Sequence, residues 1–279
     1  MDSDFSYLRR IKTGKNMKTR KEQIASFERL LDIMDELREK CPWDQKQTFE
    51  SLRKLTIEEV YELGDAILRS DLAEIKKELG DVLLHIVFYA KIGAEQDSFD
   101  IGDVMDNLIE KLIYRHPHVF GETKVQNARE VEENWEALKL KEKDRGRRVL
   151  EGVPASLPAL VKANRIQEKA RGMGFDWEEK QQVWDKVKEE LEEFEAEVRA
   201  NDQKNMESEL GDLIFSIVNA ARLYDIDPES ALERTNQKFI RRFNHLEEQT
   251  LLKGKSLHKM SLAEMDFYWE EAKKEEKKS

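Results

Sequence analysis

The sequence predicts an all-α protein built from two tandem helical domains. Apolar residues recur every three or four positions through most of the chain, as on one face of a helix. No segment alternates polar and β-branched residues as a strand would. The second half of the chain repeats the motifs of the first, so one helical unit occurs twice.

The first half contains five segments with a helical pattern. The first spans residues 22–40 and ends at Cys41–Pro42. We expect the second helix to begin at Thr56, because Thr56 and Glu59 have the spacing of a capping box. The remaining helices are expected from a cap at Ser70–Asp71 to about Ile92, from Asp100 to His116–Pro117, and over residues 130–142.

A charged segment with two glycines and two prolines separates the repeats. This composition, at residues 143–158, is typical of a linker. We therefore expect an N-terminal helical domain at 21–142 and a C-terminal helical domain at 159–279. Residues 1–20 are polar and basic, so we expect them to form a disordered extension rather than a secretory signal.

Composition excludes several classes of function. The net charge of −11 should repel a phosphate backbone, which argues against nucleic acid as a partner. The most apolar stretch is far shorter than the ~20 residues that a membrane span needs, so we expect no membrane partner. A single cysteine, Cys41, forbids an intrachain disulfide and fits a cytoplasmic location.

Two acidic motifs recur at equal spacing. A shift of 131 residues places Glu58-Glu59-Val60-Tyr61-Glu62 on Glu189-Glu190-Leu191-Glu192-Glu193. The same shift places Glu78-Leu79-Gly80-Asp81 on Glu209-Leu210-Gly211-Asp212. A single motif of this kind would usually be a solvated helix face. Its recurrence at equal spacing favours a functional site over a solvated helix face.

The spacing of the acids has physical consequences. Residues three or four apart share one helix face, so the acids of each motif converge. The segments after Asp81 and Asp212 are apolar nearly all round, which predicts buried helices. Two carboxylates 4 Å apart repel by about 4 kcal/mol at an effective dielectric constant of 20, so the group needs cations or raised pKa values. All-oxygen sites suit Mg²⁺, with Mn²⁺ as a possible substitute.

The glycine within each second motif has two possible explanations. Gly80 and Gly211 each cost about 1 kcal/mol in a helix interior. Their recurrence suggests that a neighbouring helix passes close by. A packing glycine without catalytic meaning is the alternative, and both can hold.

Basic and aromatic residues follow each acidic set. Lys238 and Arg242 lie four apart on one helix face, where arginine suits a bidentate phosphate contact. Without the repeat, an ordinary amphipathic helix would explain this pair. Trp269 and Lys273 also lie four apart, and the indole can either stack on a base or pack. The corresponding residues in the first repeat are Lys111, Arg115, Trp135 and Lys139.

Longer motifs make the chain similar to a known family. They are Cys41-Pro42-Trp43-Asp44, Leu55–Glu59, the two Glu-Leu-Gly-Asp segments, Arg115–Phe120, Ser156–Leu160, Gly174–Trp177 and Asn236–Phe243. With them the chain resembles tandem MazG-type nucleoside triphosphate pyrophosphohydrolases. The resemblance implies an all-α fold whose four-helix-bundle-like core is completed by homodimerisation. It also implies Mg²⁺-dependent hydrolysis of nucleoside triphosphates (NTPs) to nucleoside monophosphate and pyrophosphate.

The resemblance also assigns roles, with the C-terminal domain favoured for catalysis. It implies that the metal ligands are Glu190, Glu193, Glu209 and Asp212, with a second site at Glu59, Glu62, Glu78 and Asp81. Nucleotide contacts are assigned to Glu189, Lys238, Arg241, Arg242, Trp269 and Lys273, and in the first repeat to Glu58, Lys111, Arg115, Trp135 and Lys139. The catalytic set is Glu189, Glu190, Glu193, Lys238 and Arg242.

The residue types suggest a mechanism. A carboxylate-bound metal orients a water molecule toward the α-phosphorus, while Lys238 and Arg242 stabilise charge on the departing pyrophosphate. Glu189 is a base, a second-layer group or a spectator. The alternative function is a non-catalytic helical dimer that binds nucleotide as a sensor or serves as a scaffold.

Overall fold

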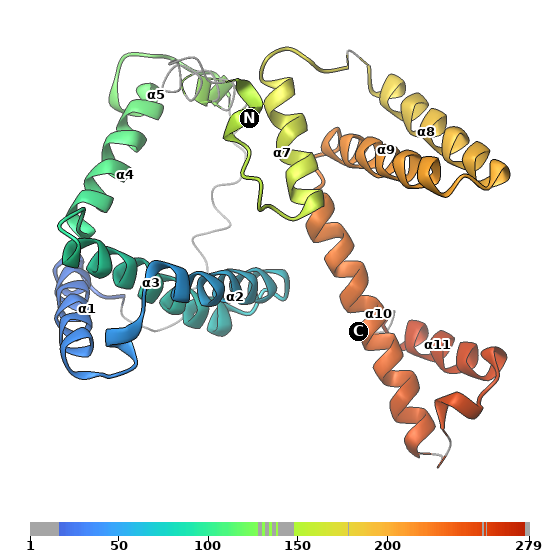
Figure 1. Ribbon diagram of the computed structural model, residues 1–279, viewed down its shortest axis with the longest axis horizontal. Helices are drawn as coiled ribbons and strands as arrows, with labels where there is room; N and C mark the ends of the chain where they lie inside the picture. Colours follow the sequence, from blue (N-terminus) through green and yellow to red (C-terminus); the bar gives the residue numbers. More distant parts are fainter. Residues whose placement is uncertain are drawn as a thin grey trace. The chain divides into compact units, whose positions relative to one another are not determined.

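The computed structural model describes residues 17–276 except 128–129, 132–133, 136–137, 139–147, 178, 253 and 255. Every regular element in these residues is a helix, which confirms the all-α prediction (Figure 1). The chain divides into two compact units, Met1–Leu112 and Ile113–Ser279. The extension at 1–16 and most of the helix expected over 130–142 lie outside the described residues.

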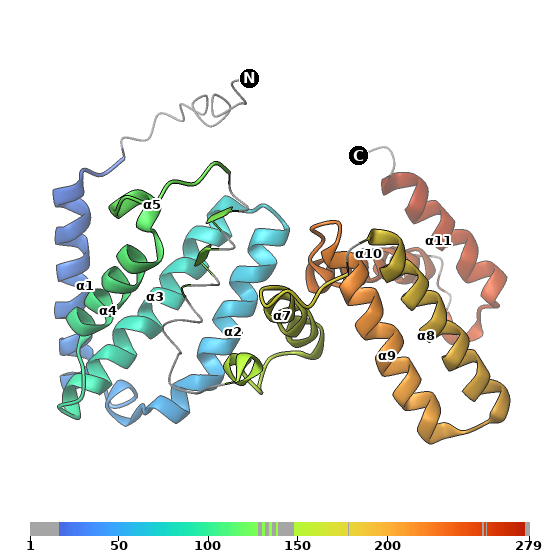
Figure 2. The same cartoon turned by 90° about the horizontal axis from the view of Figure 1, so that it is seen from above.

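The first unit is built around a helical hairpin. Its elements are α1 (Arg20–Lys40), η2 (Asp44–Lys46), α2 (Phe49–Leu68), α3 (Leu72–Glu95) and α4 (Ile101–Arg115), whose last residues belong to the second unit. Helices α2 and α3 lie side by side in both views, and α1 contacts α3 (Figure 2). The core between them contains Met34, Leu52, Val87, Phe88 and Ile92, all at most 3% exposed.

The start expected for the second helix is wrong. Helix α2 begins at Phe49, because Thr48 and Ser51 form a reciprocal capping box about two turns earlier than expected. The hydroxyl of Thr56 instead donates to the backbone oxygen of Leu52 at 3.0 Å, inside the helix. Helices α3 and α4 begin where the sequence predicts, with Asp71 as the N-cap of α3.

The second unit contains another hairpin and a second helix pair. Helices α8 and α9 pack together, α7 contacts both α9 and α10, and α10 contacts α11. The elements are α5 (Pro117–Phe120), η3 (Val149–Gly152), α7 (Ala159–Arg171), α8 (Lys180–Ala200), α9 (Gln203–Arg222), α10 (Pro228–Leu252), η4 (Leu257–Lys259) and α11 (Leu262–Glu276).

The two hairpins are closed by the same turn. Ser70 and Asn201 both have a φ of 56°, a left-handed conformation. Ser70 follows the end of α2 and Asn201 the end of α8, so each ends the first helix of its hairpin. The next residues, Asp71 and Asp202, cap α3 and α9 through their side chains. These positions correspond under the 131-residue shift, so the sequence repeat is also a structural repeat.

Two packing expectations are wrong for the single chain. A Cβ added at Gly80 or Gly211 would meet nothing within 4 Å, so no helix of the described chain packs against these glycines. Helices α3 and α9 are not buried all round: Ile86 is 44% exposed and Ile217 is 49% exposed. The apolar residues behind both acidic motifs therefore present uncovered faces. No helix that the structure describes combines the length and apolar character that crossing a membrane requires.

The core of the first unit should depend on Leu52, which is 1% exposed. We expect Leu52→Ala to lower the free energy of unfolding by about 2–5 kcal/mol, because truncation leaves a cavity among packed side chains. Urea denaturation followed by circular dichroism measures the change. Ile24→Ala is the control, since Ile24 is 60% exposed on α1. Equal losses in both variants would contradict this packing.

Candidate functional site

Three predicted ligands converge between α8 and α9. Glu190 and Glu193 lie three residues apart on one face of α8, and Glu209 lies on the neighbouring face of α9. One carboxylate oxygen from each lies within 4.8 Å of the others, and we call this group the second carboxylate cluster. Glu190 is only 6% exposed. The antiparallel hairpin therefore holds three negative charges together in a partly buried place.

Asp212, the fourth predicted ligand, lies outside this cluster. It follows Glu209 by one helical turn, and its charge still acts on Glu209. Burial raises the pKa of Glu209 most, and the charges of Glu193, Asp212 and Glu190 raise it further. The cluster is thus an unfavourable arrangement of anions that a cation would relieve.

Lys186 is a member of the site that the sequence reasoning missed. Its Nζ donates to Glu190 Oε1 at 2.6 Å and to Glu189 Oε1 at 2.9 Å. These contacts raise the pKa of Lys186, chiefly through Glu190. The signal was present, because Lys186 precedes Glu189 and Glu190 by three and four residues, the spacing of helical ion pairs. Glu189 itself is exposed.

The first unit contains a matching group, the first carboxylate cluster. Glu59 on α2 and Glu78 and Asp81 on α3 bring carboxylate oxygens within 4.8 Å of one another. Glu62, the remaining predicted ligand, is exposed and outside the group. Burial raises the pKa of Glu59 most, followed by the charges of Asp81 and Glu62.

Glu78 is the most buried acid of the two clusters. It is 2% exposed, and its Oε2 has no hydrogen-bond partner among the described residues. Its Oε1 accepts a hydrogen bond from Lys77 Nζ at 2.7 Å. A buried carboxylate oxygen without a donor is costly, so the first carboxylate cluster also fits a cation.

The predicted phosphate-binding residues gather on α10 and α11. Glu276 Oε2 accepts from Arg242 Nε at 3.0 Å and from Arg242 Nη2 at 2.7 Å. The guanidinium of Arg242 lies 5.7 Å from the ring centre of Trp269. The ring centre of Phe239 lies 4.9 Å from that of the same indole, so Trp269 is at least a packing residue. Arg241 reaches the other carboxylate oxygen of Glu276 at 3.4 Å.

The other two predicted cations are placed separately. Lys273 Nζ lies 2.5 Å from Glu270 Oε1 on the same helix, and Lys238 is half-buried on α10. Within the described residues, no hydrogen bond or ion pair joins Lys238 or Arg242 to the second carboxylate cluster. The single chain thus presents the acidic and basic parts of the predicted site as two groups.

The arginine–tryptophan arrangement also repeats. Arg115 lies 5.6 Å from the ring centre of Trp135, close to the 5.7 Å of Arg242 and Trp269. Lys111 and Glu58 are exposed. Lys139 lies outside the described residues.

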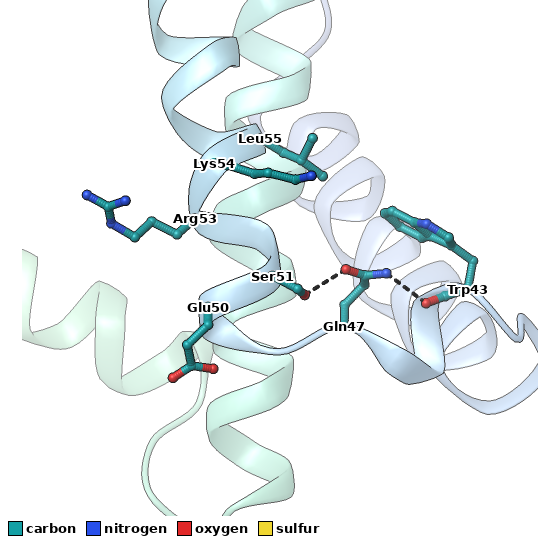
Figure 3. Close-up of a pocket in the computed structure, with 7 residues that line it drawn as sticks. All are labelled: Trp43, Gln47, Glu50, Ser51, Arg53, Lys54 and Leu55. Carbon is teal, nitrogen blue, oxygen red and sulfur yellow. Dashed lines mark hydrogen bonds between the residues drawn. The ribbon is translucent and has the colours of Figure 1, made fainter.

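A separate hollow lies beside the start of α2. Its volume is about 460 Å³ (Figure 3). The side chain of Gln47 connects two residues that line the hollow. Its Nε2 donates to the backbone oxygen of Trp43 at 3.0 Å, and its Oε1 accepts a hydrogen bond from the Ser51 hydroxyl at 2.7 Å. The lining residues are Trp43, Gln47, Glu50, Ser51, Arg53, Lys54 and Leu55. None of them is a predicted site residue.

Comparison with known proteins gives a consistent result. The MazG nucleotide pyrophosphohydrolase domain model matches residues 47–120 and 178–247. The nucleoside triphosphate pyrophosphohydrolase/pyrophosphatase MazG of Thermotoga maritima is 44% identical over 256 residues, covering 91% of this chain and 98% of its own length. The nucleoside triphosphate pyrophosphohydrolase of Escherichia coli K12 is 40% identical over 260 residues, which cover 91% of this chain and 99% of that protein.

One solved structure is also similar. The crystal structure of a mazG-related protein from Thermotoga maritima shares 31% sequence identity with a TM-score of 0.36. The match covers 40% of this chain and 98% of that one.

The raised pKa of Glu209 predicts a pH-dependent cost to stability. A carboxyl whose pKa is higher in the folded state holds its proton more tightly there. Its charge therefore destabilises the fold above that pKa, and the cost disappears as the pH falls through it. In the presence of a chelator that removes divalent cations, and at mildly alkaline pH, the Glu209→Gln variant should unfold at a higher temperature than wild type.

This gain should vanish as the pH falls toward the ordinary glutamate value of 4.5. Differential scanning calorimetry across this range measures it. The control is Glu207→Gln, an exposed position on the same helix outside the cluster. Glu209→Gln melting below wild type at alkaline pH would show that the cluster's repulsion does not act on the fold.

Proposed function

The chain belongs to the MazG nucleotide pyrophosphohydrolase family and is a nucleoside triphosphate pyrophosphohydrolase, and from this premise we propose that its activity depends on Mg²⁺ held by the second carboxylate cluster. The family reaction hydrolyses an NTP to nucleoside monophosphate and pyrophosphate. The observation that supports the metal is the convergence of Glu190, Glu193 and Glu209 within 4.8 Å.

The residues present fit a hard divalent cation. Every candidate ligand is a carboxylate, and Mg²⁺ and Mn²⁺ prefer oxygen ligands. We assign Asp212 as the fourth acid, because it lies one turn from Glu209 and its charge acts on that residue. By the same reasoning, we propose a second metal site at Glu59, Glu78 and Asp81, with Glu62 beside it. The unpartnered Oε2 of Glu78 supports this second site.

The proposed mechanism divides the work between two groups of side chains. A divalent metal ion, when bound, activates water and offsets the triphosphate charge. Glu189 lies beside the cluster and is exposed, where it can accept a proton from the attacking water or orient that water. Lys238 and Arg242 stabilise the charge that develops on the departing pyrophosphate. Trp269 fixes the guanidinium of Arg242 and offers an aromatic surface next to it.

We propose that the working form is a homodimer. The acidic and basic groups of the site are separate in one chain, and the helices that present them have uncovered apolar residues. Ile217 on α9 is 49% exposed, Phe239 on α10 is 56% exposed and Ile109 on α4 is 51% exposed. Exposed apolar surface on this scale is typical of an interaction surface. A second copy that covers these residues would complete the helical bundles.

Dimerisation should depend on the apolar face of α4. We expect Ile109→Asp to shift the mass measured by light scattering from twice 32.9 kDa toward 32.9 kDa, because a charge in an apolar interface is costly. Asn107→Asp, which adds a charge at an exposed polar position on the same helix, should remain dimeric. A monomeric wild-type protein, or an unchanged Ile109→Asp dimer, would contradict the proposal.

Removing the ligands of the second carboxylate cluster should abolish turnover. We expect Glu190→Gln with Glu193→Gln to lower kcat by about a thousandfold, equal to about 4 kcal/mol of lost transition-state stabilisation. Pyrophosphate release from several NTPs with and without Mg²⁺ measures the loss, and chromatography identifies the products. Products other than monophosphate and pyrophosphate would contradict attack at the α-phosphorus.

The matched control places the same charge change elsewhere on α8. Glu192→Gln with Glu195→Gln alters two exposed acids outside the cluster and should keep activity within about twofold, as expected for surface substitutions. The corresponding change at Glu59 and Glu62 reports on the first unit. If the Glu190/Glu193 variant retains wild-type activity, catalysis does not occur at the second carboxylate cluster.

A further inference from the structure

The ion pair between Arg242 and Glu276 has a consequence for substrate binding. We propose that Glu276 is a resident competitor for the phosphate-binding edge of Arg242, which the pyrophosphate portion of the substrate must displace. This inference rests on the proposed role of Arg242 as a phosphate contact. It assigns a role to a residue outside the predicted site.

The geometry places Glu276 where a phosphate would bind. A guanidinium offers its donors as a planar fork that fits carboxylate and phosphate oxygens alike. Arg242 directs Nε and Nη2 of this fork to one oxygen of Glu276, at 3.0 and 2.7 Å. The indole of Trp269 lies over the guanidinium at 5.7 Å. Glu276 thus occupies the edge through which Arg242 can grip an anion.

The two partners differ in how firmly they are held. Arg242 lies inside α10, packs against Trp269, and has a side chain that is 16% exposed. The side chain of Glu276, on α11, is 28% exposed, so water reaches it more readily than it reaches Arg242. Glu276 can therefore leave while Arg242 stays in place.

Charge makes Glu276 a true competitor. Its hydrogen bond with Arg242 lowers the pKa of Glu276, so the carboxylate is ionised at neutral pH. Arg241 contacts the same carboxylate at 3.4 Å, so Glu276 neutralises two cations when no phosphate is bound. A triphosphate brings more negative charge and can replace it.

The competition should affect binding and product release rather than the chemical step. When pyrophosphate leaves, Glu276 can return to Arg242 and oppose rebinding. The first repeat has the same sequence spacing: Glu142 follows Trp135 by seven residues, as Glu276 follows Trp269. The recurrence is expected if the acid belongs to the site.

The test compares two adjacent acids on α11 in the full chain. Glu276→Gln keeps the shape of the side chain and removes its charge. Glu275→Gln is the matched control, because Glu275 points toward His245, with Oε2 3.6 Å from Nδ1. Calorimetric titration with inorganic pyrophosphate, without turnover, measures affinity, and steady-state rates give KM and kcat.

We expect Glu276→Gln to bind pyrophosphate about three- to fivefold more tightly, with a similar fall in KM, as one partly exposed ion pair allows. Its kcat should not fall, and Glu275→Gln should match wild type. The affinity of Glu276→Asp for pyrophosphate should lie between those of wild type and Glu276→Gln, because its carboxylate is on a shorter side chain. This variant replaces Glu276→Gln in the test if Glu276→Gln is unstable. Unchanged binding would overturn the proposal. Weaker binding would also overturn it, because Glu276 would then position Arg242 for phosphate.

The titration separates this inference from the proposed function. If wild type releases no monophosphate and pyrophosphate, the proposed function fails, while pyrophosphate affinity still decides the role of Glu276. If wild type is active and Glu276→Gln binds pyrophosphate as wild type does, only this inference fails. If neither protein binds pyrophosphate, Glu276 has no phosphate to compete with and the inference fails.

Discussion

Repulsion between carboxylates on facing helices is the constraint on which the site depends. Glu190, Glu193 and Glu209 hold oxygens within 4.8 Å of one another, where unscreened anions oppose folding. In the hairpin that holds them, Asn201 takes the left-handed conformation at the end of α8 and Asp202 caps α9. Both repeats keep such a cost in the same helical hairpin, which supports the proposal that the clusters bind cations.

The two repeats offset their negative charge in different ways. In the second unit Lys186 on α8 binds Glu190, whereas in the first unit Lys77 on α3 binds Glu78. The 131-residue shift places Leu55 at the position of Lys186 and Ser208 at that of Lys77, so neither lysine has a counterpart. The clusters share two equivalent acids, Glu59 with Glu190 and Glu78 with Glu209, but differ in the third, which is Asp81 in one and Glu193 in the other. The third acid and the neighbouring charges therefore both diverged after duplication, which fits unequal roles for the two units.

Local features of the fold were predictable because they depend on neighbours in sequence. Helical periodicity and the cap at Asp71 located α3, and three-residue spacing paired Glu190 with Glu193. The start of α2 was mistaken because two capping patterns compete, and Thr48 with Ser51 forms the cap. Gly80 was misread because its packing depends on what lies beside α3, which spacing cannot reveal. Likewise, the contact between Arg242 and Glu276 joins residues 34 apart and depends on how α11 folds back onto α10.

Metal binding without nucleotide tests the central claim most directly. Titration of the full chain with Mn²⁺, followed by the electron paramagnetic resonance signal of the free ion, counts the sites and gives their affinities. Glu190→Gln with Glu193→Gln should lose one class of site, while Glu192→Gln with Glu195→Gln should bind as wild type does. Identical binding curves for wild type and the Glu190/Glu193 variant would show that the second carboxylate cluster does not hold the metal.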